Sequence, residues 1–398
     1  MLNRTTSLAT LKPTTAISRP TEVLFGEGRI ASTGELLDRL DARSVVLVAD
    51  PAAYEQSGAS RVLEPILADR DVRLFTEFSP NPKDTEIAAG AALLVRRPPD
   101  VLLAVGGGSA LDTAKLLSVC ATQKRDPREV ILGTAAIDRP GLRVIAVPTT
   151  AGTGAEATHF AVVYVDGVKC SPAHPSLLPA AAIVDPKLTW SMPPPLTASS
   201  GLDALCQAVE SFWAVGATAE SQEYAREALR LALEHLEPAV NHPSPASRAG
   251  MAWAAHLAGR AINISKTTAS HAISYALTSK YGLPHGMAVA VTLGPLLVLN
   301  SQVGEHDCVD PRGATHVRAA LDELLRLFDC RTPSEARERI TRLLQAVGCP
   351  TSPSEGGVRS AEERQEITSS VNVERLGNNP RRLNTQMIES LLENAGID

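Results

Sequence analysis

A short apolar run that leads into three consecutive glycines constrains this chain more than any other feature. Residues 101–105 have the length and composition of a buried strand, and the glycines that follow are Gly106, Gly107 and Gly108. We expect Ser109 to cap a helix that begins near Leu111. A strand, a glycine turn and a helix N-terminus in this order present backbone N–H groups to an anion. Although the spacing departs from the usual G-x-G-x-x-G fingerprint, the segment predicts a pyrophosphate site and a bound dinucleotide.

Strands and helices alternate through the first half of the chain. A helix is expected over residues 86–97, and the expected strands cover residues 45–49, 72–78, 101–105, 143–148, 161–164 and 181–184. Parallel strands need crossover connections, and helical crossovers cover both faces of a sheet. The pattern therefore predicts an α/β domain with a largely parallel sheet.

The composition changes at three prolines, residues 193–195. Beyond them strand-like runs nearly vanish, and helical periodicity appears in residues 219–236, 246–264 and 319–328. A chain of 398 residues is long enough for two domains. We predict a dinucleotide-binding α/β domain over residues 20–193 and an all-helical domain over residues 194–398, with the ligand cleft between them.

Composition and charge argue against several classes of protein. A net charge of −6 does not suit a general nucleic-acid binder, and no apolar run reaches the roughly 20 residues of a membrane-spanning helix. The six cysteines are scattered without C-x-x-C spacing, which predicts reduced thiols and a cytoplasmic protein. Residues 1–19 are rich in threonine and lack the apolar stretch of a secretory signal, so we expect a disordered lead there.

Two further features of the first half are candidates for cofactor binding. Asp50 ends the strand expected over residues 45–49, where a carboxylate accepts a hydrogen bond from a ribose hydroxyl and repels a 2′-phosphate. This favours NAD over NADP, although an aspartate that starts a turn before Pro51 explains the residue equally well. The loop after residues 143–148 is expected to contact the nucleotide rather than form a plain turn. Its hydroxyls belong to Thr149, Thr150 and Thr153.

Polar side chains in the second half form a candidate metal site. Asp203 and Gln207 are four residues apart and share one face of a helix. A proline and a glycine flank His285 and break the helix there, so that its ring can point back toward His271. One carboxylate, two imidazoles and an amide oxygen suit a divalent cation such as Fe²⁺ or Zn²⁺. The alternative is that each histidine is an ordinary packed or surface residue.

Several spaced motifs occur along the chain in one order. They are Phe25-Gly-Glu-Gly28, Pro80-Asn-Pro82, Gly106-Gly-Gly-Ser109 with Asp112 and Lys115, Pro148-Thr-Thr-Ala-Gly-Thr-Gly154 with Glu156, Gly201-Leu-Asp-Ala204, Pro284-His-Gly286 and Asn378-Asn-Pro380. Together they resemble the iron-containing (group III) alcohol dehydrogenases over almost the whole chain. The resemblance implies the fold shared by that family and dehydroquinate synthase, an NAD(H)- or NADP(H)-dependent enzyme, a metal in the helical domain, and a homo-oligomer.

Carried over by position, the resemblance also implies roles for single residues. The metal ligands would be Asp203, Gln207, His271 and His285, while Asp112 and Lys169 would lie close to the cofactor. The family has a histidine where this chain has Gln207. Neutral imidazole is a better ligand for Fe²⁺ or Zn²⁺ than an amide oxygen, so we expect weaker metal binding.

Three stretches, residues 163–169, 207–213 and 262–268, are similar to one branch of this family, the phosphonoacetaldehyde reductases. That branch makes 2-hydroxyethylphosphonate in phosphonate natural-product biosynthesis, which implies a small phosphonate aldehyde as the substrate. One cation and several neutral donors just before His271 suit a phosphonate head group. These residues are Asn263, Ser265, Lys266, Thr267 and Thr268. The alternative is a solvated surface lysine beside threonines that cap a helix.

The predicted reaction is the reduction of an aldehyde by hydride from a nicotinamide, with the metal stabilising the alkoxide through His271 and His285. Tyr275, four residues past His271, is a candidate proton donor besides water and a ribose hydroxyl. Two alternatives share the fold: a broad-specificity alcohol or diol dehydrogenase, and an NAD-using lyase that resembles dehydroquinate synthase. A third alternative, a catalytically inactive nucleotide-binding protein, is supported by Gln207 alone.

Overall fold

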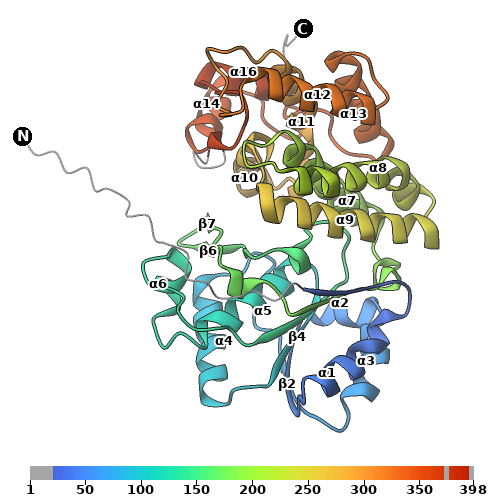
Figure 1. Ribbon diagram of the computed structural model, residues 1–398, viewed down its shortest axis with the longest axis vertical. Coiled ribbons are helices and arrows are strands. Elements are labelled where there is room, and N and C mark those ends of the chain that lie inside the picture. Colours follow the sequence, from blue (N-terminus) through green and yellow to red (C-terminus); the bar gives the residue numbers. More distant parts are fainter. Residues whose placement is uncertain (1–20, 372–375, 394–398) are drawn as a thin grey trace, which may run out of the picture.

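A computed structural model of the chain describes residues 21–371 and 376–393 (Figure 1). The predicted lead over residues 1–19 lies outside these residues. A sheet with its covering helices forms the lower half of Figure 1, and a layered group of helices forms the upper half. The predicted fold class, a parallel α/β part followed by an all-helical part, is confirmed.

The sheet has six strands in the order β1-β8-β5-β4-β2-β3, and every neighbouring pair is parallel. The strands are β1 (Glu22–Phe25), β2 (Ser44–Ala49), β3 (Asp71–Phe75), β4 (Val101–Gly106), β5 (Arg143–Pro148) and β8 (Ala181–Val184). The sequence predicted all of them except β1. From β2 the chain adds β3 on one side and β4 on the other, so the strand order reverses at the carboxyl ends of β2 and β4. Ligands of open α/β sheets bind at such a reversal.

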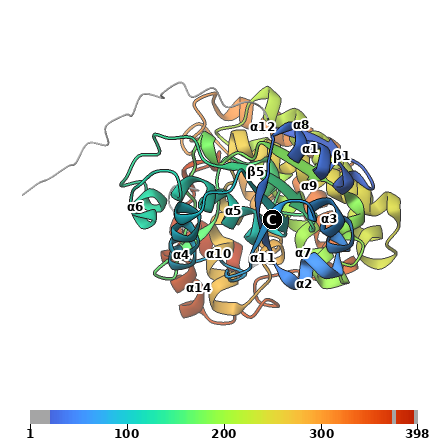
Figure 2. The same cartoon turned by 90° about the horizontal axis from the view of Figure 1, so that it is seen from below.

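Helices cover both faces of this sheet, as Figure 2 shows from below. Alternate side chains of β4 enter two different cores, and none of them is exposed to solvent. Leu102 and Ala104 pack with α4 (Asp84–Arg96), α5 (Gly108–Cys120) and α6 (Pro127–Leu132). Leu103 and Val105 pack on the other face with α1 (Thr33–Arg39), α2 (Pro51–Gln56) and α3 (Ala59–Leu67). Burial on both faces explains why the strands read as continuous apolar runs.

The strand expected over residues 161–164 does not join the sheet. Instead, β6 (Val163–Val165) pairs antiparallel with β7 (Val168–Cys170) in a separate hairpin. Asp166 and Gly167 form its turn with φ of 50° and 79°. Two central residues with positive φ are typical of the turns that close two-residue hairpins, so the chain folds back on itself here. The hairpin lies at the boundary between the two halves, below α10 in Figure 1.

The second half contains only helices among the residues that the structure describes. They are α7 (Pro194–Trp213), α8 (Ala219–Asn241), α9 (Pro245–Ser265), α10 (Ala269–Tyr281), α11 (His285–Ser301), α12 (Ala314–Leu327), α13 (Pro333–Ala346), α14 (Ala361–Ser369) and α16 (Thr385–Glu393). α11 is the central helix, because every residue from 286 to 300 is buried. None of the described helices is long and apolar enough to cross a membrane.

The two halves meet closely at α9. A Cβ atom on Gly154 would lie 2.4 Å from the Cα of Gly259, so both residues must be glycine for the backbones to approach this far. The last strand of the sheet ends at Val184 and α7 begins at Pro194. The domain boundary at residue 193 stays a prediction.

Candidate active site

A cavity of about 260 Å³ lies between the sheet and the helices. The α/β half contributes the glycine loop, residues 80–82, residues 153–162 in part, and the β6–β7 hairpin. The helical half contributes Asp203, Gln207, Ile262, Thr267, His271, Tyr275, Thr278 and His285. Residues predicted to bind cofactor, metal and substrate therefore line one shared space.

The two predicted nucleotide loops lie side by side. Because β4 and β5 are parallel neighbours, their ends at Gly106 and Pro148 are directly paired. The Thr149 N–H donates to the Gly106 carbonyl at 2.9 Å, and a Cβ on Gly108 would lie 2.9 Å from the Thr153 side chain. Thr150 lies beside Gly107 in the same way, at 3.5 Å. This close contact requires glycine at position 108, so Gly107 and Gly108 bring no side chain of their own to the start of α5, where backbone N–H groups can bind an anion.

The expected cap at Ser109 is wrong. α5 begins at Gly108 with Gly107 as its N-cap, so Ser109 already lies inside the first turn. Its hydroxyl instead donates to the carbonyl of Pro80. A glycine at the N-cap leaves the first N–H groups of α5 unblocked by a side chain, and Ser109 fixes the loop over residues 80–82 beside them.

Asp112 has a structural partner that the sequence prediction did not include. The Lys115 ammonium is fully buried and donates to Asp112 at 3.3 Å and to the Thr158 hydroxyl at 2.9 Å. The second Asp112 oxygen accepts the Val162 N–H at 2.9 Å. Asp112 through Val162 and Lys115 through Thr158 thus fasten the segment after Gly154 to α5, and Asp112 is part of the cavity wall.

Asp50 lies at the carboxyl end of β2, next to Gly106. One carboxylate oxygen accepts the Ala53 N–H at 2.8 Å and caps α2, which is the turn-forming alternative. The residue is exposed, and a carboxylate can accept further hydrogen bonds. Its predicted contact with a ribose hydroxyl is compatible with this position and stays a prediction.

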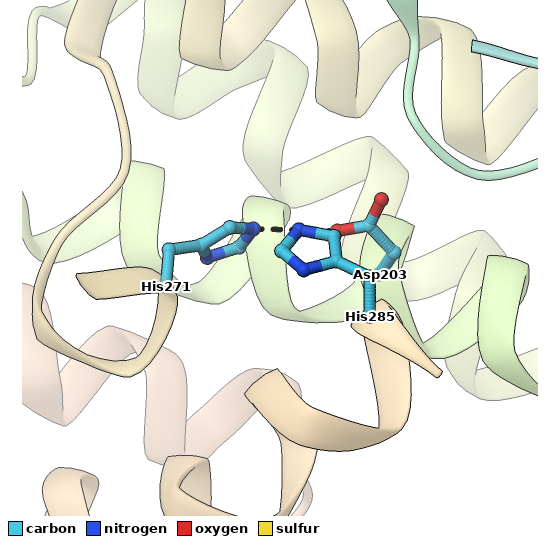
Figure 3. A group of neighbouring side chains, drawn as sticks. All are labelled: Asp203, His271 and His285. Atoms are coloured by element: carbon cyan, nitrogen blue, oxygen red, sulfur yellow. Dashed lines mark hydrogen bonds and ion pairs between the residues drawn. The ribbon is translucent and has the colours of Figure 1, made fainter. Parts of the chain in front are cut away.

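The predicted metal ligands come together. Ligand atoms of Asp203, His271 and His285 all lie within 4.8 Å of one another. Figure 3 shows the three side chains gathered at one place. Asp203 lies on α7, His271 in the first turn of α10, and His285 at the first position of α11. The predicted helix break at Pro284 is confirmed, and it brings the His285 ring within 5.6 Å of the His271 ring, centroid to centroid.

Glu210 supports this group, and the sequence prediction missed it. Its side chain is completely buried, one oxygen bonds to Nδ1 of His271, and the other accepts the Ser270 N–H at 2.8 Å. The Nε2 atom of His271 is then left to face Asp203 at 3.3 Å. Carboxylates often orient a metal-binding histidine in this way. The available signal was spacing, because Asp203, Gln207 and Glu210 are at positions i, i+4 and i+7 of one helix.

The two histidines differ in protonation when no metal is bound. Burial alone would lower the pKa of His271, but the Glu210 charge and the hydrogen bonds to Asp203 and Glu210 outweigh burial and raise the pKa to about 9. Burial and the positive charge of Lys169 lower the pKa of His285 to about 3. His285 is therefore neutral at physiological pH and ready to act as a ligand.

Gln207 gives an independent test of whether a cation fits. Its Oε1 atom is buried and has no hydrogen-bond partner among the described residues, whereas its Nε2 atom donates to the Thr153 carbonyl at 3.4 Å. A buried acceptor without a partner is rare in proteins and is expected where a ligand completes the site. Together with the three neighbouring ligand atoms, this oxygen suits a divalent cation.

Lys169 and Tyr275 meet on the other side of His285. The Lys169 ammonium lies 4.0 Å from the centre of the Tyr275 ring, and that ring stacks on His285 at 6.3 Å. Both residues line the cavity, together with two hydroxyl residues that the sequence prediction missed, Ser171 and Thr278.

The five residues predicted to bind a phosphonate are not gathered at one place. Only Thr267 lines the cavity. Lys266 is exposed at the end of α9, where its φ of 61° reverses the chain direction. The side chains of Lys266 and Thr267 therefore point in different directions, although the two residues are adjacent in the sequence.

The other three members of that set bond to the protein itself. Asn263 accepts the His159 N–H at 2.7 Å, and the Ser265 hydroxyl is buried against a serine of α7. Thr268 donates to Glu210 at 2.8 Å. Thr268 therefore helps to position His271, and the substrate role of this group stays a prediction that its scattered positions do not support.

Two protein-family models match the chain. Iron-containing alcohol dehydrogenase matches residues 20–186, and the C-terminal model of the Fe-containing alcohol dehydrogenase family matches residues 197–396. The chain belongs to the iron-containing alcohol dehydrogenase family, which confirms the predicted resemblance. It is an oxidoreductase that interconverts alcohols and carbonyl compounds.

Individual relatives narrow the resemblance. A phosphonoacetaldehyde reductase of Streptomyces viridochromogenes is 37% identical, with 94% of this chain and 96% of the relative covered. An NAD-dependent methanol dehydrogenase of Bacillus methanolicus is 30% identical, with 94% and 98% covered. Among solved structures, sulfoacetaldehyde reductase from Bifidobacterium kashiwanohense in complex with NAD+ is 30% identical, with a TM-score of 0.84 over 94% of this chain and 96% of that chain. The predicted similarity to the phosphonoacetaldehyde reductases is confirmed.

Proposed function

We propose that this chain reduces phosphonoacetaldehyde to 2-hydroxyethylphosphonate with NADH and a bound divalent metal, as part of phosphonate natural-product biosynthesis. The observation that carries the proposal is the shared cavity, which the glycine loop, the Asp203–His271–His285 group and Lys169 all line. The 37% identity with a phosphonoacetaldehyde reductase supports this choice of aldehyde. In the balanced reaction the carbonyl carbon gains a hydride, its oxygen gains a proton, and NADH becomes NAD⁺.

The side chains divide the work between them. Asp203, His271 and His285 hold the metal, with Gln207 as a further ligand, and a bound metal supplies Lewis-acid stabilisation of the alkoxide. The two nucleotide loops orient the cofactor, which supplies the hydride when it is bound. Tyr275 is the proposed source of the proton, because its ring lies on His285 beside the reacting centre.

We propose Fe²⁺ as the resident metal and NADH as the preferred cofactor. The matched family is named for iron, and two of the relatives are named for NAD or were solved with it. A carboxylate at Asp50 repels the 2′-phosphate of NADPH. We expect kcat/KM with NADH to exceed kcat/KM with NADPH. In Asp50→Gly the ratio of these two values should fall about tenfold. Equal use of both cofactors by the unmodified enzyme would refute this assignment.

A broad-specificity alcohol or diol dehydrogenase is the second candidate. The apolar side chains of Phe160, Val162 and Ile262 line part of the cavity and suit neutral aldehydes. A 1,3-propanediol dehydrogenase of Klebsiella pneumoniae, 30% identical over 94% of this chain, supports it. A cytoplasmic location and assembly into a homo-oligomer stay predictions.

The test is the rate of NADH oxidation at 340 nm with phosphonoacetaldehyde and with propionaldehyde, using protein loaded anaerobically with Fe²⁺. We expect kcat/KM to be at least about 100-fold higher for the phosphonate, the ratio expected from one charged hydrogen-bonding site. Equal values would favour the second candidate. Absence of net NADH oxidation with either aldehyde would contradict both.

A further inference from the structure

One end of the cavity carries a cation and hydroxyls within about two helical turns of His271. His271, Tyr275 and Thr278 occupy positions i, i+4 and i+7 of α10, so they share one face of that helix. All three line the cavity. Lys169 and Ser171 are two residues apart in the extended chain of β7 and its continuation, so they point to the same side. The Lys169–Tyr275 contact joins these two faces.

Lys169 is the positive charge of this end. It is the only lysine or arginine in the cavity lining among the described residues. Its ammonium lies over the Tyr275 ring at 4.0 Å, and no carboxylate of the described residues pairs with it. Asp112, a carboxylate of the same wall, is already bonded to Lys115 and to the Val162 N–H. A cation inside a cavity that pairs with no carboxylate of residues 21–371 and 376–393 suits an anionic ligand.

Thr278 is a second, independent sign of a ligand here. Its hydroxyl oxygen is inaccessible to solvent in its present surroundings and has no hydrogen-bond partner among the described residues. It lines the same cavity one turn beyond Tyr275. Buried hydroxyls are nearly always satisfied in proteins, so this one lacks the partner that most such groups have.

We propose that Lys169, Thr278 and Ser171 form the subsite for the tetrahedral anionic head group of the aldehyde. This inference rests on the proposed function and names the part of the site that recognises the substrate. One helical turn, roughly 5 Å, separates His271 from Tyr275, on which Lys169 lies. Two carbon atoms bridge a comparable length between the reacting carbonyl and a phosphonate or sulfonate oxygen. The subsite therefore replaces the group around Lys266, which is exposed.

The experiment measures discrimination between charged and neutral aldehydes. Iron-loaded enzyme and NADH are assayed with phosphonoacetaldehyde, sulfoacetaldehyde and propionaldehyde. For each charged aldehyde, kcat/KM is divided by kcat/KM for propionaldehyde, and this quotient is called its ratio. Lys169→Met should lower the phosphonate ratio about 10- to 100-fold, because a charge-assisted hydrogen bond is lost. Lys169→Arg should restore most of it, and Thr278→Val should lower it about fivefold. Lys266→Met is the matched control, with an unchanged ratio expected.

A binding measurement separates substrate recognition from a general defect. Calorimetric titration with 2-hydroxyethylphosphonate, on enzyme carrying Fe²⁺ and NAD⁺, should show a higher Kd for Lys169→Met by the same factor as the ratio. The Kd of NADH, measured by its fluorescence, should change much less. If Lys169→Met raises the Kd of NADH by the same factor by which it lowers the phosphonate ratio, Lys169 binds the cofactor and the proposal is overturned.

The outcomes also separate this inference from the proposed function. If wild-type enzyme reduces phosphonoacetaldehyde but Lys169→Met keeps its ratio, or if Lys266→Met loses it, the subsite is wrong and the function stands. If wild-type enzyme prefers sulfoacetaldehyde and Lys169→Met abolishes that preference, the subsite stands and the proposed substrate is wrong. If no charged aldehyde is preferred, both are wrong.

Discussion

The two ends of the cavity are built differently. At the metal end, His271 is held by Glu210, Glu210 is held by Thr268 and a backbone N–H, and all of these groups are buried. At the other end, Lys169 lies on the Tyr275 ring, and the Thr278 hydroxyl has no hydrogen-bond partner in the described part of the chain. Under the proposed function, the first end would hold the resident metal ion and the second would bind the exchanging substrate. Resident cofactors and exchanging substrates need these two kinds of site.

Removing a proposed metal ligand should have the largest effect on activity, and it should disturb the metal end of the cavity alone. We expect Asp203→Ala and His285→Ala to lower kcat/KM about 10³-fold or more, because the alkoxide loses several kcal/mol of stabilisation. The glycine loop is not altered, so the Kd of NADH should stay within about twofold of wild type. Activity within tenfold of wild type in either variant would show that the reaction does not depend on this group.

Removing the supporting carboxylate should have a smaller effect. Glu210→Gln keeps the shape but weakens the hold on His271, and we expect the Kd for Fe²⁺ to rise about 10- to 100-fold. Excess metal should restore much of the activity, which a purely structural defect would not allow. Glu237→Gln, at an exposed position of α8, is the control. An unchanged metal Kd would mean that Glu210 only caps α10.

Replacing Gln207, which stands where the family has a histidine, should strengthen metal binding. In Gln207→His an imidazole takes the place of an amide oxygen, and we expect metal to bind about tenfold more tightly. Competition with a fluorescent chelator would measure this change. Weaker binding would show that Gln207 serves the Thr153 loop, to which it donates a hydrogen bond.

The smallest expected effect is a dependence of metal binding on pH, which arises from His271 at the metal end of the cavity. In metal-free protein the pKa of His271 is raised from 6.5 to about 9, so its contribution to stability is complete below pH 6.5 and is lost as the pH rises through about 9. A metal requires the neutral ring and must displace a proton below that pH. The rise in Tm on adding Zn²⁺, which does not oxidise, should therefore grow by roughly 1–3 °C per pH unit between 6.5 and 9. Stabilisation by NAD⁺ is the control, and a constant metal effect would contradict the protonation of His271.

Much of the fold could be predicted because its signals are local. Apolar runs marked the buried strands, and Pro284 marked the break that turns His285 toward His271. What depends on distant packing could not be predicted. Glu210 gains its role only because α10 begins beside α7. The Thr278 hydroxyl lacks a hydrogen-bond partner among the described residues because of how distant segments pack around it. The spread of the residues around Lys266 could not be predicted either, because a positive φ at Lys266 changes the direction of the chain there.

The central claim is that a metal bound by Asp203, His271 and His285 shares one cavity with the nicotinamide. Anomalous diffraction at the iron edge, from crystals grown anaerobically with Fe²⁺ and NAD⁺, tests it most directly. We predict one strong peak in contact with all three side chains, and density for the nicotinamide in the cavity beside it. A peak elsewhere, or a nicotinamide directed away from His271 and His285, would contradict the account.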